Sequence, residues 1–298
     1  MSFETGTPNS ASLSLAIPTF NQDVQLAQAA KEFLEISQKY GHLIQILVQD
    51  NASTDSTQVE LSLNWSFAEL SRNDSNLGFA GNVETLALRS KGDWIWLLGS
   101  GDSPNMDQLE GLLNFLDDLE DDVGLIVAGK YKLFSPWIGG QIFRTSALRR
   151  VFAHRAFDSR WQVWPHLEWC LKIRAEGWRV IPLELGARVS RGEGDWHRTG
   201  LTYPLALELL RQLKSHPRTR ETQHDIGLAM QACVAWYVQD RLEGKMGRFS
   251  LNLVALVRGL GFQILRPSLA GKVCAATLLP LGLIRVAVRV ARGLGLSI

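Results

Sequence analysis

Three apolar segments in the first third of the chain end in polar residues, and this pattern constrains the fold more than any other. The segments are 13–17, 43–48 and 94–98. The second continues into Asp50, and the third continues into a turn that contains Asp102. Helical patterns separate them, and strands that alternate with helices are typical of a parallel α/β sheet. Since ligands of open α/β sheets bind outside the carboxyl ends of the strands, the two carboxylates indicate a ligand with hydroxyl or N–H donors, or one held through a metal.

The α/β pattern extends to about residue 200, where the chain changes character. Apolar residues at a 3.6-residue period predict helices, and short apolar runs predict strands. We expect helices at 23–40, from the capping box at 55–58 to before Trp65, and at 81–90, 107–119 and 165–175, with further strands at 67–70, 123–128 and 179–183. Gly177 is expected to end the helix 165–175 in the left-handed conformation. Only helical patterns follow residue 200, at 201–213, 226–242 and 249–265. We therefore expect one domain over 1–200 and a smaller helical region over 201–298.

The charge of the chain is small overall but unevenly distributed. Its 31 Lys and Arg and 30 Asp and Glu give a net charge of +1. From residue 241 to the end, nine basic residues and a single acid carry +8, so the preceding residues carry −7. Hydrophobic residues make up 46% of the chain, which is enough to form a core, and the charged fraction of 20% argues against disorder. The acidic body offers no basic groove for a nucleic acid. The three cysteines lack metal-ligand spacing, and we interpret Cys170 and Cys233 as buried thiols in a reducing compartment.

The last part of the chain combines apolar residues with a line of arginines. Arg285, Arg289 and Arg292 lie on one face of a helical pattern that is otherwise largely apolar. This basic amphipathic pattern suits an anionic membrane surface, although a helix packed on the α/β domain with its arginines in water has the same pattern. No run of 18 apolar residues and no signal-peptide pattern occurs in the sequence. We predict a cytoplasmic protein attached peripherally to the inner face of the cell membrane.

Short motifs follow the predicted strands, and their order and spacing are more specific than any one of them alone. They are IPTFN at 17–21, VQDNASTD at 48–55, NLGFAGN at 76–82 and WLLGSGD at 96–102, with a weaker continuation in GGQIFR at 139–144 and HLEWCLK at 166–172. Together they resemble the family 2 glycosyltransferases, over residues 12–200. The resemblance implies the GT-A fold, a nucleotide-diphosphate sugar as donor and a divalent metal, Mg²⁺ or Mn²⁺, as cofactor. Within the family the chain looks most like bacterial sugar transferases of surface polysaccharide assembly.

The resemblance assigns the nucleotide side of the site to residues that follow the first strands. Asp50 is implied as the acceptor of a nucleobase N–H, and Asn76, Gly78 and Asn82 are implied on the nucleotide side. Thr19 and Asn21, just past the first strand, could reach the nucleotide, and residues at this position equally suit a turn. Turn geometry alone would also explain an Asp at position 50 or 102.

Asp102 is implied as the metal ligand. A cation that bridges the two phosphates of the donor needs an oxygen ligand on the protein. The family has an Asp-any-Asp motif at this point, whereas this chain has Ser100, Gly101 and Asp102, so one carboxylate is missing. Cation binding is then expected to be weaker or supported mainly by the phosphates. His197 is a second candidate ligand, and Arg191 could close over the diphosphate.

The general base, which takes the proton from the acceptor hydroxyl, is the least defined position. The family's acidic pair aligns at and just before His166, so His166, Glu168 and Asp158 are the candidates. The pKa of a His lies near neutral pH, which suits a base, but a polar residue at a helix start needs no such role. Trp161 and Trp164 present flat apolar faces that suit sugar rings on the acceptor side, or the core.

These residues predict a metal-assisted glycosyltransferase, inverting by resemblance, that moves a sugar from its nucleotide donor to an acceptor hydroxyl. The expected acceptor is a glycan or a lipid-linked sugar. The missing carboxylate and the displaced base also fit a second hypothesis, a non-catalytic relative that binds nucleotide sugars or glycans. A Rossmann dehydrogenase and a P-loop kinase are excluded, because the loop after the first strand lacks the glycine-rich fingerprint and no Walker sequence occurs.

Overall fold

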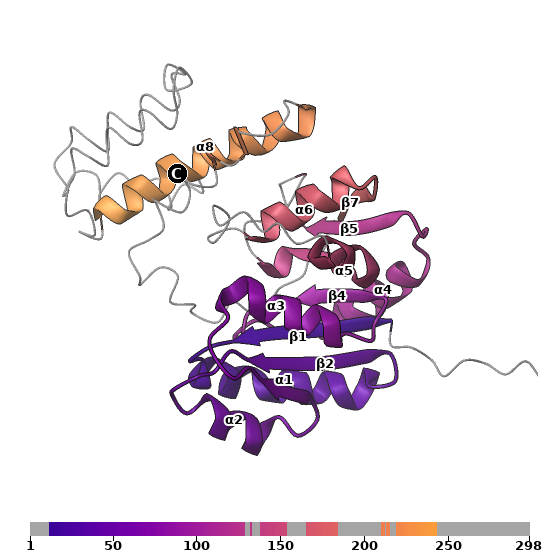
Figure 1. Ribbon diagram of the computed structural model, residues 1–298, viewed down its shortest axis with the longest axis vertical. Coiled ribbons are helices and arrows are strands. Elements are labelled where there is room, and N and C mark those ends of the chain that lie inside the picture. Colours follow the sequence, from indigo (N-terminus) through magenta and orange to yellow (C-terminus); the bar gives the residue numbers. More distant parts are fainter. Residues whose placement is uncertain are drawn as a thin grey trace, which may run out of the picture. The chain divides into compact units, whose positions relative to one another are not determined.

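The strands of the first part of the chain form one seven-stranded sheet in the order β3-β2-β1-β4-β6-β5-β7. Figure 1 labels β2, β1, β4, β5 and β7 of this sheet. The computed structural model of the chain describes residues 12–128, 132, 138–153, 165–183, 210–211, 213–214 and 219–242. The chain divides into two compact units, Met1–Gly194 and Asp195–Ile298. The strands of the first unit are β1 Leu13–Thr19, β2 Ile44–Asp50, β3 Glu69–Arg72, β4 Trp94–Leu97, β5 Val123–Ala128, β6 Gln141–Arg144 and β7 Arg179–Leu183.

The sheet is mostly parallel, and among the described strands only β6 runs antiparallel, between β4 and β5. Leu15 of β1 lies opposite Ile46 of β2 on one side and Trp96 of β4 on the other, which aligns the three central strands. β1 and β2 are buried along nearly their whole length, as expected for parallel strands with both faces covered. The predicted α/β fold is confirmed, with one antiparallel strand inserted.

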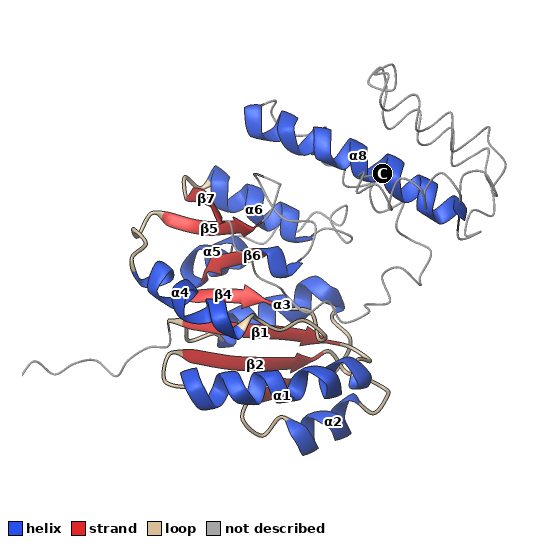
Figure 2. Ribbon diagram, turned by 180° about the vertical axis from the view of Figure 1, so that it is seen from behind, coloured by secondary structure: helices blue, strands red, loops and turns tan. Residues whose placement is uncertain are grey.

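Helices cover both faces of this sheet, as the opposite views in Figures 1 and 2 show. One face carries α1 Asp23–Tyr40, α2 Thr57–Asn64 and α4 Met106–Asp117. Their apolar residues join the main core, in which Phe33 and Trp65 are fully buried with ring centroids 5.2 Å apart. The other face carries α3 Gly78–Arg89, α5 Thr145–Ala153 and α6 Pro165–Ala175, and α5 packs against both α3 and α6.

Most element limits follow the sequence patterns closely. α1, α6, β5 and β7 have the predicted bounds, whereas β3 begins at Glu69 instead of residue 67 and α3 at Gly78 instead of residue 81. Gly177 follows α6 with a φ of +90°, the left-handed conformation expected at a helix end. The sequence patterns did not predict β6 or α5, because elements this short show no clear period.

The ends of several elements meet at one edge of the sheet, here named the carboxyl edge. β1 and β2 end there at Thr19 and Asp50, and β4 ends there at Leu97. Since α3 and α6 precede the parallel strands β4 and β7, both helices begin at this edge, and antiparallel β6 begins there at Gln141. The fold therefore gathers polar residues from strand ends and helix starts on the side where α/β sheets bind ligands.

The described part of the second unit contains the long helix α8, Arg220–Leu242. The hydroxyl of Thr219 accepts from the backbone N–H of Thr222 at 3.1 Å. This cap explains why α8 begins before residue 226, where the apolar period first becomes visible. The predicted helix 249–265 and the basic segment 266–298 lie outside the described residues. In the part of the chain that the structure describes, no helix is both long and apolar enough to cross a membrane.

Candidate active site at the carboxyl edge

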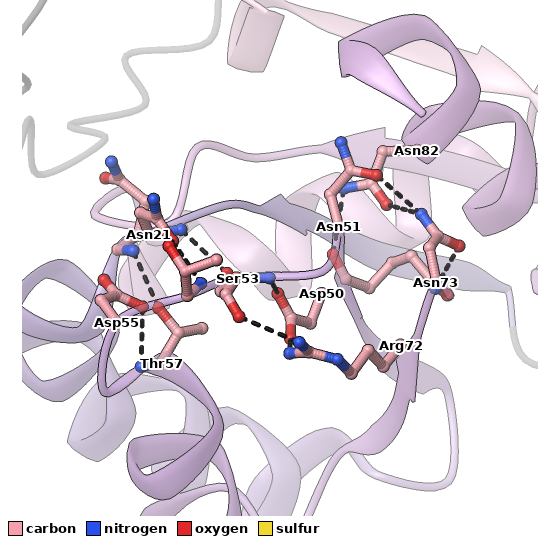
Figure 3. A network of polar contacts seen from close by, with 12 residues as sticks. Asn21, Asp50, Asn51, Ser53, Asp55, Thr57, Arg72, Asn73 and Asn82 are labelled. Atoms are coloured by element: carbon pink, nitrogen blue, oxygen red, sulfur yellow. Dashed lines mark hydrogen bonds and ion pairs between the residues drawn. The ribbon is translucent and has the colours of Figure 1, made fainter. Parts of the chain in front are cut away.

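The loops that follow β1 and β2 are tied to each other (Figure 3). Asn21 has a positive φ of 53°, and its backbone N–H donates to Ser53 Oγ at 2.9 Å. Its side-chain Oδ1 accepts from the backbone N–H of Thr54 at 2.8 Å. Asp55 Oδ1 accepts from the backbone N–H of Thr57, the first residue of α2, at 2.9 Å. The capping box predicted at 55–58 is not formed, because the N-cap is Ser56 and its side chain makes no capping hydrogen bond. Asn tolerates the left-handed conformation, which lets Asn21 adopt this backbone. Its two hydrogen bonds to Ser53 and Thr54 hold the two loops together.

Asp50 ends β2 as a buried carboxylate with an ion-pair partner (Figure 3). Its Oδ1 accepts from the backbone N–H of Ser53 at 3.0 Å, and its Oδ2 pairs with the guanidinium of Arg72. Arg72 also donates to the Ser53 carbonyl at 2.9 Å. A carboxylate that is 2% exposed needs such partners, because burial of an unpaired charge is costly. The motifs did not identify Arg72, although its position opposite Asp50 in the β2–β3 register would have pointed to it.

A buried network of side-chain amides lies beside Asp50 (Figure 3). Asn73 Nδ2 donates to Asn51 Oδ1 and to Asn82 Oδ1, each at 2.9 Å, and Asn73 Oδ1 accepts from Gln49 Nε2 at 2.9 Å. Asn82 Nδ2 donates to the Gln49 carbonyl at 3.0 Å. Networks that satisfy their members rigidify the segments they join. Here the network joins the end of β2 to α3, and it gives Asn82 a structural role.

Asn51 extends this network to the first residues of α3. Its Nδ2 donates to Asn76 Oδ1 at 2.8 Å and to the Gly78 carbonyl at 3.2 Å, and its Oδ1 accepts from the backbone N–H of Leu77 at 2.9 Å. Gly78 has a φ of +71°, which a residue with a side chain adopts only with strain. Asn76 and Gly78 are therefore held at the carboxyl edge, one strand away from Thr19.

Thr19 presents a buried hydroxyl at the end of β1. Thr19 lies opposite Asp50 in the β1–β2 register. Its Oγ1 is buried and has no hydrogen-bond partner among the residues that the structure describes. Because buried polar atoms in folded proteins are normally paired, this hydroxyl is available to a ligand at the carboxyl edge.

Asp102 lies in the turn after β4, at the same edge of the sheet. Its backbone N–H donates to the Gly99 carbonyl at 2.9 Å, and its Oδ2 accepts from the backbone N–H of Gly99 at 3.3 Å. A Cβ at residue 99 would lie 2.9 Å from that oxygen, so glycine leaves the space that the carboxylate occupies. The next residue, Ser103, donates its hydroxyl to Glu32 of α1 and anchors the turn. Ser100, where the family motif has its first carboxylate, is buried nearby in the chain.

Asp102 is suited to a cation that takes one carboxylate from the protein and most of its other ligands from the phosphates of a bound nucleotide and from water. Within the described ranges, no group of three or more His, Cys, Asp or Glu side chains could hold a metal. Mg²⁺ typically takes one or two protein carboxylates and completes its octahedron with phosphate oxygens and water. A single carboxylate at position 102 fits this donor set. His197 and Arg191, the other residues predicted near the diphosphate, lie outside the described residues.

The first turn of α6 brings His166 and Glu168 to the carboxyl edge, and both side chains are buried. Glu168 Oε1 pairs with Lys172 Nζ at 2.8 Å. Glu168 Oε2 is buried and has no hydrogen-bond partner in the described part of the chain. A buried carboxylate oxygen in this state is a candidate proton acceptor. The remaining predicted residues of the base and acceptor side lie outside the described residues: Asp158, Trp161 and Trp164.

Cys170 lies in the same helix as Glu168. Its side chain is buried, which confirms the sequence prediction, and burial raises the pKa of the thiol well above its ordinary value. A protonated thiol is a poor nucleophile. The side chain of Cys233 lies outside the described residues.

Comparisons with known proteins relate this chain to sugar transferases. The sequence model of glycosyl transferase family 2 matches residues 14–170. Abequosyltransferase RfbV of Salmonella typhimurium is 32% identical over 113 residues, which are 37% of this chain and 34% of that protein, so the match spans about a third of the relative.

Two solved structures share the fold. A mannosyltransferase of Pyrobaculum calidifontis, in complex with GDP-Man and Mn²⁺, has a TM-score of 0.56 at 16% identity, and the match covers 95% of this chain and 81% of the other. TarS 1–349 of S. aureus, in complex with UDP, has a TM-score of 0.51 at 13% identity, with 88% and 86% covered. At these identities the likeness concerns the fold.

Proposed function

This chain belongs to glycosyl transferase family 2, and we propose that it moves a sugar from a nucleotide-diphosphate sugar to a hydroxyl group of a glycan or lipid-linked acceptor. We propose further that the reaction inverts the anomeric configuration and uses a divalent cation, Mg²⁺ or Mn²⁺. The observation that carries the proposal is that Asp50, Asp102 and Glu168, each in a different environment, lie at the same edge of the sheet. Each environment suits a different part of this reaction.

The nucleotide is proposed to bind across the ends of β1 and β2. Asp50 offers a carboxylate oxygen to a nucleobase N–H, and the hydroxyl of Thr19, which has no partner among the described residues, lies on the neighbouring strand. Asn76 and the backbone of Gly78 would line the phosphate side, where a helix begins. Asn21 and Asn82 would act indirectly, since their described hydrogen bonds hold the surrounding loops. The GDP-Man and UDP of the two similar structures support a nucleoside diphosphate as the leaving group.

The reaction needs a proton acceptor and compensation of the charge on the leaving group. A divalent cation supplies that compensation when bound, and Asp102 would hold it, with His197 as a further candidate. We assign Glu168 Oε2 as the general base, because it is a buried carboxylate oxygen that has no hydrogen-bond partner among the residues that the structure describes. His166 in the same turn is the alternative, as is Asp158.

In one displacement, the acceptor oxygen bonds to the anomeric carbon while its proton passes to the base and the bond to the diphosphate oxygen breaks. Attack on the face opposite the leaving group inverts the configuration. Trp161 and Trp164 are proposed to support the acceptor sugar.

Thermal unfolding of the full chain with UDP-, GDP-, CMP- and dTDP-sugars tests the proposal. We expect one class of donor to raise the Tm, and Mn²⁺ to increase this effect, because Asp102 would hold the cation and the cation would compensate the charge of the diphosphate. The increase with Mn²⁺ should disappear in Asp102→Ala. It should persist in Asp121→Ala, the matched control, because Asp121 is fully exposed and precedes β5 at the opposite edge. Stabilisation by a donor without any release of nucleoside diphosphate would favour the non-catalytic relative, which the missing carboxylate also suggests.

We also propose that the basic segment 266–298 attaches the protein to the inner face of the cell membrane, where a lipid-linked acceptor would be found. The support is the sequence pattern of apolar residues and arginines. Sedimentation with anionic phosphatidylglycerol vesicles should carry the intact chain down, and deletion of 266–298 should abolish this. An intact chain that stays in the supernatant contradicts the attachment.

A further inference from the structure

The ion pair of Glu168 with Lys172 gives the two oxygens of one carboxylate different environments. Lys172 Nζ lies 2.8 Å from Glu168 Oε1, and the two residues are one helical turn apart on α6. The side chain of Glu168 is 7% exposed and that of Lys172 is 31% exposed, so the lysine reaches from the helix surface to a carboxylate that water barely contacts. Oε2 has no hydrogen-bond partner among the described residues.

Stability alone does not explain this arrangement. Glu–Lys pairs four residues apart stabilise exposed helices only weakly, and a buried ion pair is commonly no more stabilising than apolar residues of the same volume. A carboxylate accepts hydrogen bonds at about four positions, and burial of an oxygen with none of them filled is unfavourable. An oxygen that is buried and has no partner in the described part of the chain therefore supports a partner that arrives with a ligand.

The backbone of this turn is restrained from its inner side. Trp169 is fully buried and meets Phe143 and Phe152 edge-on, with ring centroids 6.4 and 5.3 Å away. It also stacks with Phe79 of α3. Since the backbone is held by these contacts, the remaining freedom of Glu168 lies in its own side-chain torsions, and the contact with Lys172 restricts these.

We propose that Lys172 is a positioning residue for sugar transfer: by holding Oε1 of Glu168, it directs Oε2 toward the acceptor hydroxyl. This inference rests on the proposed function and on Glu168 as the base. The proton of the acceptor hydroxyl passes to Oε2, the acceptor oxygen bonds to the anomeric carbon, and the bond to the diphosphate oxygen breaks. Lys172 keeps its proton throughout and touches neither substrate.

The test compares Lys172→Met and Lys172→Arg in the full chain, with the donor found by the thermal screen. Release of nucleoside diphosphate gives kcat and KM, and calorimetry gives the Kd of the same nucleoside diphosphate. For Lys172→Met we expect kcat to fall about tenfold to a hundredfold while KM and Kd change less than about twofold, because a misplaced base slows the reaction without weakening the binding of the donor. Lys172→Arg, which keeps the charge, should recover most of kcat.

Lys31→Met is the matched control. Lys31 also forms a pair with a glutamate four residues on, Glu35 of α1, but at 4.0 Å and with side chains that are 85% and 52% exposed. We expect its kcat to equal that of the natural chain. An unchanged kcat in Lys172→Met, or no recovery in Lys172→Arg, overturns the proposal.

A double variant separates positioning from a general loss of structure. If Lys172 acts through Glu168, then Lys172→Met has no further effect on kcat in a Glu168→Gln background. The double variant has an uncharged side chain at both positions, so it also serves should Lys172→Met alone unfold. Equal losses in both backgrounds overturn the proposal. Full turnover in Glu168→Gln contradicts the assignment of the base and this inference, but leaves the transferase function intact. If the natural chain releases no nucleoside diphosphate from any donor, the proposed function itself is refuted.

Discussion

Phe79 of α3 stacks on Trp169 of α6, with the two rings inclined by 16° and their centroids 6.3 Å apart. Phe79 belongs to the helix start that Asn51 holds beside β2, and Trp169 follows Glu168 in the chain. Trp169 is fully buried, whereas Phe79 is 39% exposed. This contact packs the nucleotide side of the candidate site against the turn that carries the proposed base.

Phe79→Ala is expected to lower the free energy of unfolding by about 1–2 kcal/mol, less than the roughly 3–5 kcal/mol for a buried aromatic, because part of the ring already contacts water. Leu88→Ala on the same helix is the control. Leu88 is 62% exposed, and its loss should change stability by less than about 0.5 kcal/mol. Urea denaturation measures both, and equal effects of the two variants would show that the stacked pair contributes nothing beyond exposed surface.

Asn73 is the branch point of the amide network, with hydrogen bonds to Gln49, Asn51 and Asn82. Asn73→Leu keeps the branched arrangement of heavy atoms but removes the amide, which leaves buried amide groups without partners at roughly 1–3 kcal/mol for each group. We expect a total loss of about 2–4 kcal/mol in the free energy of unfolding. Asn64→Ala, at an exposed hydrogen bond to Glu60, should cost less than about 1 kcal/mol. If urea denaturation shows similarly small losses of unfolding free energy for Asn73→Leu and Asn64→Ala, the amide network does not stabilise the end of β2 and α3 as proposed.

Gly99→Ala is expected to displace the carboxylate of Asp102, because the new Cβ would lie 2.9 Å from Oδ2. The part of the donor-induced Tm increase that depends on Mn²⁺ should be lost, while the part that is independent of the metal should remain. Gly111→Ala on α4 is the control, since nothing lies within 4 Å of its Cβ. It should raise stability by about 0.5–1 kcal/mol through helix propensity. A full response to Mn²⁺ in Gly99→Ala would contradict the role of Asp102.

Glu69 should make the stability depend on pH. Partial burial acts to raise its pKa, but hydrogen bonds from Lys91 and Gln45 outweigh this and lower the pKa below the ordinary value of 4.5. A lowered pKa in the folded state means that the stabilisation is fully present above the unfolded pKa and is lost as pH falls through the folded pKa. Glu69→Gln should therefore lower stability at pH 7 by at most about 1 kcal/mol, since the side chain is 45% exposed. In strongly acidic buffer, below the folded pKa, urea denaturation should show no difference in stability between Glu69→Gln and the natural chain. An equal difference at both pH values would contradict a pH-dependent contribution of Glu69.

The fold class and the family could be predicted because both depend on local patterns. An apolar strand and a helical period are visible within a few residues, and α1 and β5 therefore have their predicted bounds. The motifs at the strand ends indicated family 2, which the match over residues 14–170 confirms. β6 escaped prediction because a four-residue strand has too few residues to show alternation, and its antiparallel direction depends on neighbours that are distant in the chain.

The sequence by itself determined the approximate positions of β1, β2, β4 and α6, and so that Asp50, Asp102 and Glu168 lie near the carboxyl edge. A strand and its stop are decided by neighbours along the chain, and parallel strands must present their ends at one edge. Only the tertiary structure decided that Asp50 meets Arg72, and that Glu168 is buried with its Oε2 lacking a hydrogen-bond partner among the described residues. The first depends on strand register and the second on side-chain packing between distant segments, and neither is encoded in any short stretch of sequence.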